Sequence, residues 1–510
     1  MMQMPVAAQV RHHAGRFPDK TVLIEGARRL SYRQLDEQVD ACAALLGERG
    51  LGKGDRVAIL APSGIDWIVC YLGIGRAGAA AVPLNWKLTA GEISAAVAIA
   101  EVALVLVHPA FDAELAHGVA AGRKLLVGDD GVHALQRLLA PFKGRRVDIE
   151  SAASEIQVIL LTGGTTGEQK AVMLSHENLF WNTLQLVVDT EMHEDDITVL
   201  ATPLHHAGAL VIWLLPHLYL GATAAILPHY RTDALIELIA AERVTNGWTP
   251  PSMTRDVLTH PLAKQRDLRS FARWYVAGGP FPRRDREEMK ALIPGVKIFN
   301  QYGLTEAGVM VSVLKDKDYE NAPDSIGRPF LHCDVKILRE DLSDAATGEV
   351  GEIAVRSPSV MQGYYGRPVE TAATFHDGWL RTGDLASMDA GGYLRFHDRL
   401  KDMVKTGGFN VYSQEIEQVL LRHPSIREIA VFGIPSERWG EEVVAVAVVR
   451  DGHLPDGEAI LAFARENLAR YKVPKQLHFV AYEALPINYS GKIVKKELRQ
   501  RFRGIDHANS

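Results

Sequence analysis

Helical and strand patterns alternate along the first part of the chain. Apolar side chains recur at a helical spacing over Tyr32–Arg49, where Gly50 closes the pattern, and Arg56–Leu60 reads as a buried strand. A second pair follows, with a helix expected over Asp66–Gly75 and a strand over Ala79–Val82. This alternation favours an α/β fold whose sheets are largely parallel.

The pattern changes further along the chain. Alternation returns over residues 178–301, and from about Gly348 the segments become shorter and richer in glycine, as in the strands expected at Gly351–Arg356 and Tyr393–Phe396. We therefore predict an α/β protein with a large multi-layer N-terminal domain of mostly parallel sheets, a β-rich subdomain, and a small mobile α+β C-terminal domain.

A polar run at residues 398–402 marks the expected domain boundary. It separates two apolar strands, and we assign 1–398 to the large domain, 399–402 to a hinge and 403–510 to the small domain. Past the boundary, a helix capped by Ser413 is expected, then strands at Ile429–Phe432 and Val443–Val449 and a helix over 459–469.

Composition excludes several classes of protein. The 510 residues carry a net charge of -6, with 47% hydrophobic and 23% charged side chains, so neither nucleic acid nor anionic lipid is an expected partner. The three cysteines fit neither a disulfide framework nor a zinc site. No secretory signal is visible, and proline and glycine interrupt the most apolar window, 209–227, which predicts a buried helix and strand. We expect a soluble cytoplasmic protein with no integral membrane segment.

A glycine- and threonine-rich loop follows the apolar run at 156–161. Glycines let backbone N–H groups close around an anion, threonine hydroxyls add donors and a lysine adds positive charge, as in a polyphosphate cradle. Glu168 and Gln169 separate the last glycine from the lysine, so this is not a Walker A sequence. A flexible turn between two strands is the alternative. The residues assigned to phosphate binding are Thr162, Gly163, Gly164, Thr165, Thr166, Gly167 and Lys170.

This loop is the first of six short motifs that follow one another along the chain. They are Thr162–Lys170, Thr202–His206, Asn300–Glu306, Arg381–Asp384, Asp398–Arg399 through Glu417, and Pro486–Lys492. In this order they resemble the motifs of the adenylate-forming superfamily, which comprises acyl-CoA synthetases, luciferases and stand-alone adenylation domains. Each motif is weak alone, but together they cover nearly the whole chain.

The third motif follows an expected strand at Val296–Phe299, where α/β sheets present ligands. Tyr302 offers a flat face to a nucleobase, Thr305 a donor to phosphate, and Glu306 a carboxylate for Mg²⁺. A surface turn that uses Thr305 and Glu306 as helix caps is the alternative. The resemblance also implies that the nucleotide contacts Asn300, Gln301, Gly303, Gly278, Gly279 and Pro280.

Two further motifs supply ribose contacts. Asp384 is suited to chelating two ribose hydroxyls, and Arg399 adds a second ribose or phosphate contact, although an Asx turn and a solvated arginine are the simpler alternatives. We assign Phe396 to the same nucleotide site.

The resemblance assigns the remaining chemistry to the C-terminal part. Lys492 matches the lysine that reaches the α-phosphate and the carboxylate, where a cation stabilises crowded negative charge. Lys401 falls at the hinge position of the family. The glycine loop that lines the pantetheine tunnel corresponds to Lys405, Gly407, Gly408 and Phe409.

The acyl group is expected near the two adjacent histidines. On a strand they would project in different directions, which disfavours a metal site; His206 matches the family's gate to the acyl pocket, whereas His205 reads as a packed core imidazole. No acidic side chain lies between His205 and Leu227, so a substrate ammonium group would have no partner there. An apolar carboxylic acid is expected. Trp213 and Trp248 are pocket walls or simply core.

These assignments predict an AMP-forming acyl-CoA ligase that uses ATP, Mg²⁺ and coenzyme A, and they allow a homodimer. Gln169 and Ala171 replace the proline and glycine usual in the family, which leaves open an acyl-adenylate transferase with a weakened first half-reaction. A loader of carrier-protein thiols, a luciferase-type oxygenase and a non-catalytic binding protein are further alternatives. Intact Thr165, Glu306, Asp384 and Lys492 argue against the last.

Overall fold

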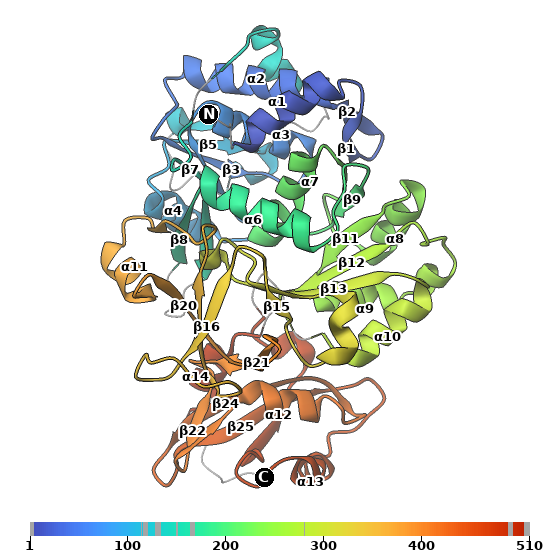
Figure 1. The fold of residues 1–510 in the computed structure, drawn as a ribbon, viewed down its shortest axis with the longest axis vertical. Helices are drawn as coiled ribbons and strands as arrows, with labels where there is room; N and C mark the ends of the chain where they lie inside the picture. Colours follow the sequence, from blue (N-terminus) through green and yellow to red (C-terminus); the bar gives the residue numbers. More distant parts are fainter. Residues whose placement is uncertain are drawn as a thin grey trace. The chain divides into compact units, whose positions relative to one another are not determined.

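The computed structural model describes residues 5–113, 115, 121–127, 134–148, 151–163, 169–279, 281–487 and 493–503. The chain forms two compact units, one of residues 1–335 and 354–382 and one of residues 336–353 and 383–510 (Figure 1). In the part that the structure describes, no helix is long and apolar enough to cross a membrane.

A nine-stranded sheet organises much of the first unit. Its order is β15-β14-β13-β12-β11-β9-β10-β1-β2, and the inner strands from β13 to β1 are parallel to one another. The strands are β1 Thr21–Glu25, β2 Arg28–Ser31, β9 Ile197–Leu200, β10 Thr223–Ile226, β11 Asn246–Thr249, β12 Arg273–Ala277, β13 Lys297–Tyr302, β14 Ser312–Leu314 and β15 Arg328–Pro329.

A seven-stranded sheet forms the second layer of strands in this unit. Its order is β18-β8-β7-β4-β3-β5-β6, with β7, β8 and β18 joined antiparallel. The strands are β3 Arg56–Leu60, β4 Ala80–Pro83, β5 Leu104–Val107, β6 Lys124–Leu126, β7 Ile156–Gly163, β8 Gln169–Ser175 and β18 Gly363–Tyr364.

Helices cover these sheets. Helices α1 to α3 contact one another, and α8 to α10 lie beside β11–β13 (Figure 1). The helices of the first unit are α1 Val6–Arg16, α2 Tyr32–Glu48, α3 Ile65–Arg76, α4 Ala90–Ile99, α5 Ala134–Leu139, α6 His176–Asp189, α7 Leu215–Leu220, α8 Thr232–Ala241, α9 Pro251–Thr259, α10 Arg283–Leu292 and α11 Pro368–Thr374.

A five-stranded sheet has the order β16-β17-β20-β19, with β21 paired to β20. The division between the two units falls within its strands. The strands are β16 Asp334–Leu338, β17 Gly351–Arg356, β19 Phe375–His376, β20 Trp379–Met388 and β21 Leu394–Arg399.

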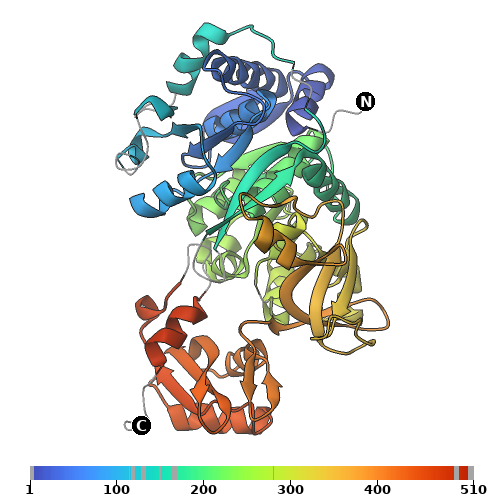
Figure 2. The same cartoon turned by 90° about the vertical axis from the view of Figure 1, so that its left-hand side faces the viewer.

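The C-terminal sheet of the second unit is covered on both faces. Its order is β23-β22-β25-β24, with β26 paired to β25, and its helices pack against it as one body (Figure 2). Along β24, Ile429 and Val431 pack with α12 and α13, whereas Ala430 and Phe432 pack with α14, which explains the continuous apolar run of this strand. The elements are β22 Val404–Thr406, β23 Phe409–Val411, α12 Ser413–Leu420, β24 Ile426–Ser436, β25 Gly440–Val449, α13 Gly457–Asn467, β26 Gln476–Phe479 and α14 Lys495–Phe502.

The predicted fold class is confirmed: mostly parallel sheets, a β-rich part and a smaller α+β C-terminal part are all present. The window 209–227 forms a π-helix, Gly208–Leu214, then α7 and β10, with Gly221 in the left-handed region between them. The three cysteines are buried free thiols.

One local prediction is wrong. Ser413 is the first residue of α12 and Tyr412 is its N-cap, because the Ser413 hydroxyl accepts a hydrogen bond from Lys495 Nζ at 2.6 Å instead of capping the helix. Asp398 and Arg399, at the start of the polar run, belong to strand β21, where Arg399 pairs with Asp384 of β20.

Candidate active site

The phosphate-loop motif lies at the end of a β-hairpin. Strands β7 and β8 pair antiparallel as far as Thr162 with Lys170 and Gly163 with Gln169. This connection between two strands, rather than from a strand to a helix, agrees with the absence of a Walker A sequence. The other assigned residues of the loop, Gly164, Thr165, Thr166 and Gly167, lie outside the described residues.

Ala171 sits in this hairpin without strain. It pairs with Leu161 in extended strand geometry and is fully buried, so the position requires no left-handed backbone and alanine is compatible with it. Whether Gln169 and Ala171 weaken the first half-reaction stays a question for experiment.

A chain of side chains connects Lys170 to Glu306. The Lys170 ammonium lies 4.6 Å from the centre of the Tyr364 ring, and the Tyr364 hydroxyl donates to Glu306 Oε1 at 3.1 Å. Lys170 also pairs with Glu370 Oε2 of α11 at 3.2 Å. Burial and the neighbouring Glu306 raise the pKa of Tyr364, so this phenol stays protonated and remains a donor.

The turn that carries Thr305 and Glu306 is held by backbone packing. A Cβ on Gly303 would lie 1.7 Å from the Val309 carbonyl oxygen, and one on Gly308 would lie 1.9 Å from the Ser359 carbonyl oxygen. The Met361 N–H donates to the Glu306 carbonyl at 2.9 Å. Only glycine allows two backbones to approach so closely, so Gly303 and Gly308 fix the position of this turn.

Thr305 and Glu306 begin a short 3₁₀-helix, Thr305–Ala307, whose N-cap is Leu304. Within the described chain, no side chain caps that helix. The alternative that these two residues serve as caps therefore receives no support.

The glycine pair after β12 lies beside the third motif. Ala277 is paired with Gln301 across β12 and β13, so Gly278 and Gly279 emerge next to Asn300, Gln301 and Tyr302 at the carboxyl edge of the sheet. Gly278 has a positive φ of 93°, which turns the chain away from the strand. Pro280 lies outside the described residues.

The two histidines follow strand β9 in a turn, not on a strand as expected. Their rings lie 4.3 Å apart, and burial lowers the pKa of both, that of His206 to about 4. Lys87, which sequence reasoning missed, lowers both pKa values further. His206 is therefore a neutral imidazole near pH 7. Among the described residues, no cluster of three or more His, Cys, Asp or Glu side chains has metal-site geometry.

The two candidate tryptophans have different surroundings. Trp213 is buried in the core, with its ring 4.6 Å from that of Tyr275. Trp248 is only partly buried, and a Cβ on Gly208 would lie 2.7 Å from its Cη2 atom. Gly208 begins the π-helix, a rare element that often marks functional sites. Trp248 is thus the better candidate for a pocket wall.

In the second unit, strands β20 and β21 bring the two predicted ribose ligands together. Asp384 Oδ1 lies 3.7 Å from Arg399 Nε, and the Asp384 side chain is buried. The Leu400 N–H donates to the Gly383 carbonyl at 2.8 Å, which fixes the turn before Asp384. Asp384 lies in a strand, so the Asx-turn alternative is not supported. Phe396 lies in β21, paired with Ala386.

The second glycine loop is a tight hairpin between β22 and β23. Gly407 and Gly408 have φ values of 57° and 82°, as a two-residue turn requires. Phe409 is 53% exposed and stacks on Tyr471 at 4.5 Å, and Trp439 contacts Gly407. Lys405 Nζ pairs with Glu340 at 2.8 Å. Exposed aromatic rings around bare backbone make this hairpin a candidate ligand surface.

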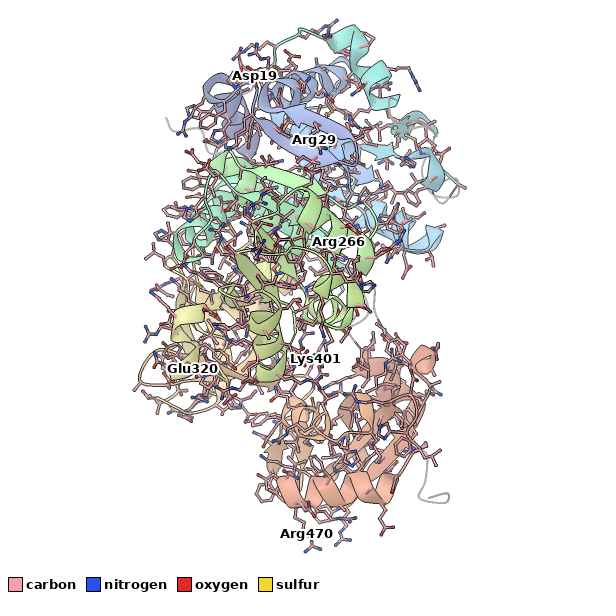
Figure 3. All side chains as sticks on the ribbon, turned by 90° about the vertical axis from the view of Figure 1, so that its right-hand side faces the viewer. Asp19, Arg29, Arg266, Glu320, Lys401 and Arg470 are labelled. Carbon is pink, nitrogen blue, oxygen red and sulfur yellow. The ribbon has the colours of Figure 1, made fainter. Side chains whose placement is uncertain are left out.

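Lys492 lies outside the described residues. Lys401 is exposed, between β21 and β22 of the second unit, and Figure 3 labels it. Sequence reasoning also missed Tyr364 and Trp439. The run Gly363-Tyr-Tyr-Gly366 was the signal available for the first, because aromatic residues between glycines often lie against a ligand or another backbone.

The fold that carries these motifs is that of the adenylate-forming enzymes. The sequence pattern described as AMP-binding enzyme matches residues 10–365, and that of the AMP-binding enzyme C-terminal domain matches residues 415–492. The chain belongs to this family, which confirms the resemblance.

Relatives match over nearly their whole length. The chain is 36% identical to a feruloyl-CoA synthase of Amycolatopsis sp, covering 95% of this chain and 96% of the relative. It is 34% identical to an indoleacetate–CoA ligase of Aromatoleum aromaticum, covering 98% of each. The crystal structure of ATP-bound MatB from Rhodopseudomonas palustris superposes with a TM-score of 0.91 at 30% identity, covering 99% of this chain and 100% of that chain.

Proposed function

We propose that this chain is an AMP-forming acid–thiol ligase, an acyl-CoA synthetase. A carboxylic acid attacks the α-phosphorus of ATP and releases pyrophosphate, and the thiol of coenzyme A then displaces AMP from the acyl-adenylate. The family and the relatives support an ATP-dependent ligase of this general kind.

One structural observation carries the proposal for the first step. Lys170, Tyr364 and Glu306 form a continuous chain from the phosphate hairpin to the fixed turn. A cation and a carboxylate held close together suit a nucleotide, because its phosphates bind both a positive side chain and a metal ion that a carboxylate can hold. We assign Lys170 to the phosphates and Thr305 to a phosphate oxygen.

The residues present fit Mg²⁺. Glu306 offers a carboxylate to an oxygen-preferring cation, and its Oε1 accepts a hydrogen bond from the Tyr364 hydroxyl. When bound, Mg²⁺ would neutralise charge on the phosphates of ATP. Glu306 would hold it, and Tyr364 would orient Glu306.

The acid is assigned an apolar body. His206 is neutral because burial lowers its pKa to about 4, so this gate adds no fixed charge at neutral pH. Trp248, lying against the bare backbone of Gly208, supplies an apolar wall. Both features suit an uncharged hydrocarbon or aryl body, and aryl acids are named in two relatives.

The second step needs different residues. We assign Lys492 to adenylate formation and the hairpin of Lys405, Gly407, Gly408 and Phe409 to the pantetheine arm of coenzyme A. Both follow Lys401 in the chain, so a rotation at Lys401 that presents one and then the other to the nucleotide would let each serve its own step.

A panel of aryl and fatty acids, with ATP and coenzyme A, tests this function. Pyrophosphate and thioester are measured separately, and we expect both to form in equal amounts with at least one acid. Thioester formation from added acyl-adenylate, without pyrophosphate from ATP and any acid, would instead identify an acyl-adenylate transferase. Competition between coenzyme A and a carrier-protein pantetheine thiol separates the ligase from a carrier-protein loader.

A further inference from the structure

A buried carboxylate ends strand β21. The Asp398 side chain is 1% exposed and accepts hydrogen bonds from the Ser413 and Arg399 N–H groups, the second at 2.8 Å. Ser413 is the first residue of α12, whose N-terminus favours a negative charge. A carboxylate buried this deeply depends on such donors, because no solvent replaces them.

Lys495, in the first turn of α14, completes the cluster. Its Nζ donates to Ser413 Oγ at 2.6 Å and pairs with Glu417 Oε1 at 2.8 Å. Glu417 also accepts from the Val431 N–H at 2.7 Å. Burial raises the pKa of Asp398 and of Glu417, and the Lys495 ammonium beside them opposes this rise.

The residues of this cluster lie on both sides of Lys401 in the chain. Asp398 precedes Lys401, whereas Ser413, Glu417 and Lys495 all follow it. The bond between the Ser413 N–H and Asp398 therefore crosses the position at which the proposed function requires the chain to turn.

A second ion pair lies one helical turn further along α14. Arg499 donates to Asp402 Oδ1 at 3.0 Å, and both residues follow Lys401. Asp398 and Asp402 are four residues apart in the chain, and so are Lys495 and Arg499. Asp398 and Lys495 lie on opposite sides of Lys401 in the chain, whereas Asp402 and Arg499 both follow it. The Arg499 pair is a natural control, since it stabilises the same helix without crossing the turning point.

We propose that Asp398, the Ser413 N–H and Lys495 form a latch that holds the small domain in one of its two orientations. The inference rests on the proposed two-step function. When the chain turns at Lys401, Asp398 separates from the donor on α12 and from Lys495, and the Asp398 carboxylate has to be hydrated, whereas Lys495 keeps its partner Glu417. Asp398 and Lys495 are positioning residues: they set the balance between orientations and do not touch substrate.

Asp398→Asn tests the latch. The amide keeps an oxygen for the Ser413 N–H but loses the charge attraction to Lys495. Single-turnover rates are measured for adenylate formation and for thioester formation from added acyl-adenylate. We expect the ratio of the two rates to change about tenfold, within the usual range of coupling between two states. Arg499→Gln should leave the ratio within about twofold, because loss of a pair on one side of the pivot affects both orientations alike.

A structural measurement accompanies the rates. Hydrogen exchange of the amides of residues 399–403 should become faster in Asp398→Asn and stay unchanged in Arg499→Gln. Lys495→Arg keeps the charge and should keep the wild-type ratio, whereas Lys495→Gln should reproduce Asp398→Asn. The double variant of Asp398→Asn with Lys495→Gln should change the ratio no more than either single variant, because both open the same latch.

The outcomes separate the latch from the function on which it rests. If the wild type forms neither pyrophosphate nor thioester, the proposed function fails. If the wild type performs both steps and Asp398→Asn keeps the wild-type ratio, or slows both steps equally, the latch is refuted. If Asp398→Asn does not fold, Lys495→Gln serves instead: it removes the charge that attracts Asp398 across Lys401, and an unchanged ratio there also refutes the latch.

Discussion

The turn at residues 303–310 and the segment at residues 398–413 are held in opposite ways. The first is fixed by backbone against backbone, with no room for a Cβ at Gly303 or Gly308. The second is held by charged side chains, with Asp398 and Lys495 at its centre. Backbone packing of this tightness has one arrangement, whereas ion pairs can open and close. From this comparison we expect the turn at residues 303–310 to stay fixed and the proposed hinge segment to move.

The largest loss of activity and stability is expected from Gly303→Ala, which displaces the turn at residues 303–310. Its Cβ would lie 1.7 Å from the Val309 carbonyl, so the turn that carries Thr305 and Glu306 has to shift. We expect adenylation to fall by more than a hundredfold and the free energy of unfolding to fall by roughly 3 kcal/mol, as for severe overpacking. Pyrophosphate release and urea unfolding measure the two effects.

Gly47→Ala in α2 is the matched control, because a Cβ there meets nothing within 4 Å. It should stabilise the protein by about 0.5–1 kcal/mol and leave activity intact. Adenylation at the wild-type rate in Gly303→Ala would contradict the account of a fixed turn.

Lys401→Pro restricts the backbone at the proposed hinge and should have the next largest effect on activity. Proline fixes φ and removes an N–H, so the chain can no longer turn freely at this residue. We expect adenylate formation within about twofold of the wild type and loss of thioester formation by more than tenfold. Lys401→Ala keeps the backbone free and should retain both steps. Equal loss of both steps in the proline variant would refute the hinge assignment.

Tyr364→Phe tests the connection between the hairpin and the fixed turn. It removes the hydroxyl that donates to Glu306 Oε1 at 3.1 Å and keeps the ring under Lys170. Loss of one hydrogen bond to a charged group corresponds to about 1.5–3 kcal/mol, so adenylation should fall by roughly ten- to a hundredfold. The Mg²⁺ concentration for half-maximal rate should rise. Tyr365→Phe, whose hydroxyl donates to Glu101 instead, should change neither value.

The smallest effect is a change of stability with pH. His176, at the start of α6, is 4% exposed, and burial lowers its pKa to about 4. The unfolded chain, with an ordinary pKa near 6.5, binds the proton first, so stability present above pH 6.5 is lost as the pH falls toward 4. His176 alone contributes a loss of about 2 kcal/mol at pH 5. Urea unfolding of His176→Gln should show a correspondingly smaller difference between pH 7 and pH 5. An unchanged difference would contradict this assignment.

The sequence predicted regular elements well where one physical signal dominates. The helix at 32–49, the strands at 56–60 and 351–356 and the apolar strand pair of the small domain all follow from periodicity or from continuous burial. The prediction failed at Ser413, and it did not include the contacts of Asp398. Both belong to a tertiary charge cluster whose partner, Lys495, is far away in the sequence, and local patterns carry no information on such a contact.

The site was predicted by motif, but the contacts that organise it were not. The motif Asn300–Glu306 predicted Gly303 as a ligand contact. The structure shows that Gly303 packs against the Val309 backbone. Tyr364 and Lys87 act on Glu306 and the histidines from remote parts of the chain, so spacing alone could not reveal them. The ligand-binding and catalytic roles assigned to the site residues, including Lys492, Lys401 and the hairpin at Lys405–Phe409, all stay predictions.

The most direct test of the central claim is exchange of labelled pyrophosphate into ATP in the absence of coenzyme A. If the fixed turn and the hairpin form an adenylation site, exchange appears only when an accepted apolar acid is present, and it is lost in Gly303→Ala. Thioester formation from supplied acyl-adenylate, with no acid-dependent exchange in the wild type, would contradict the account.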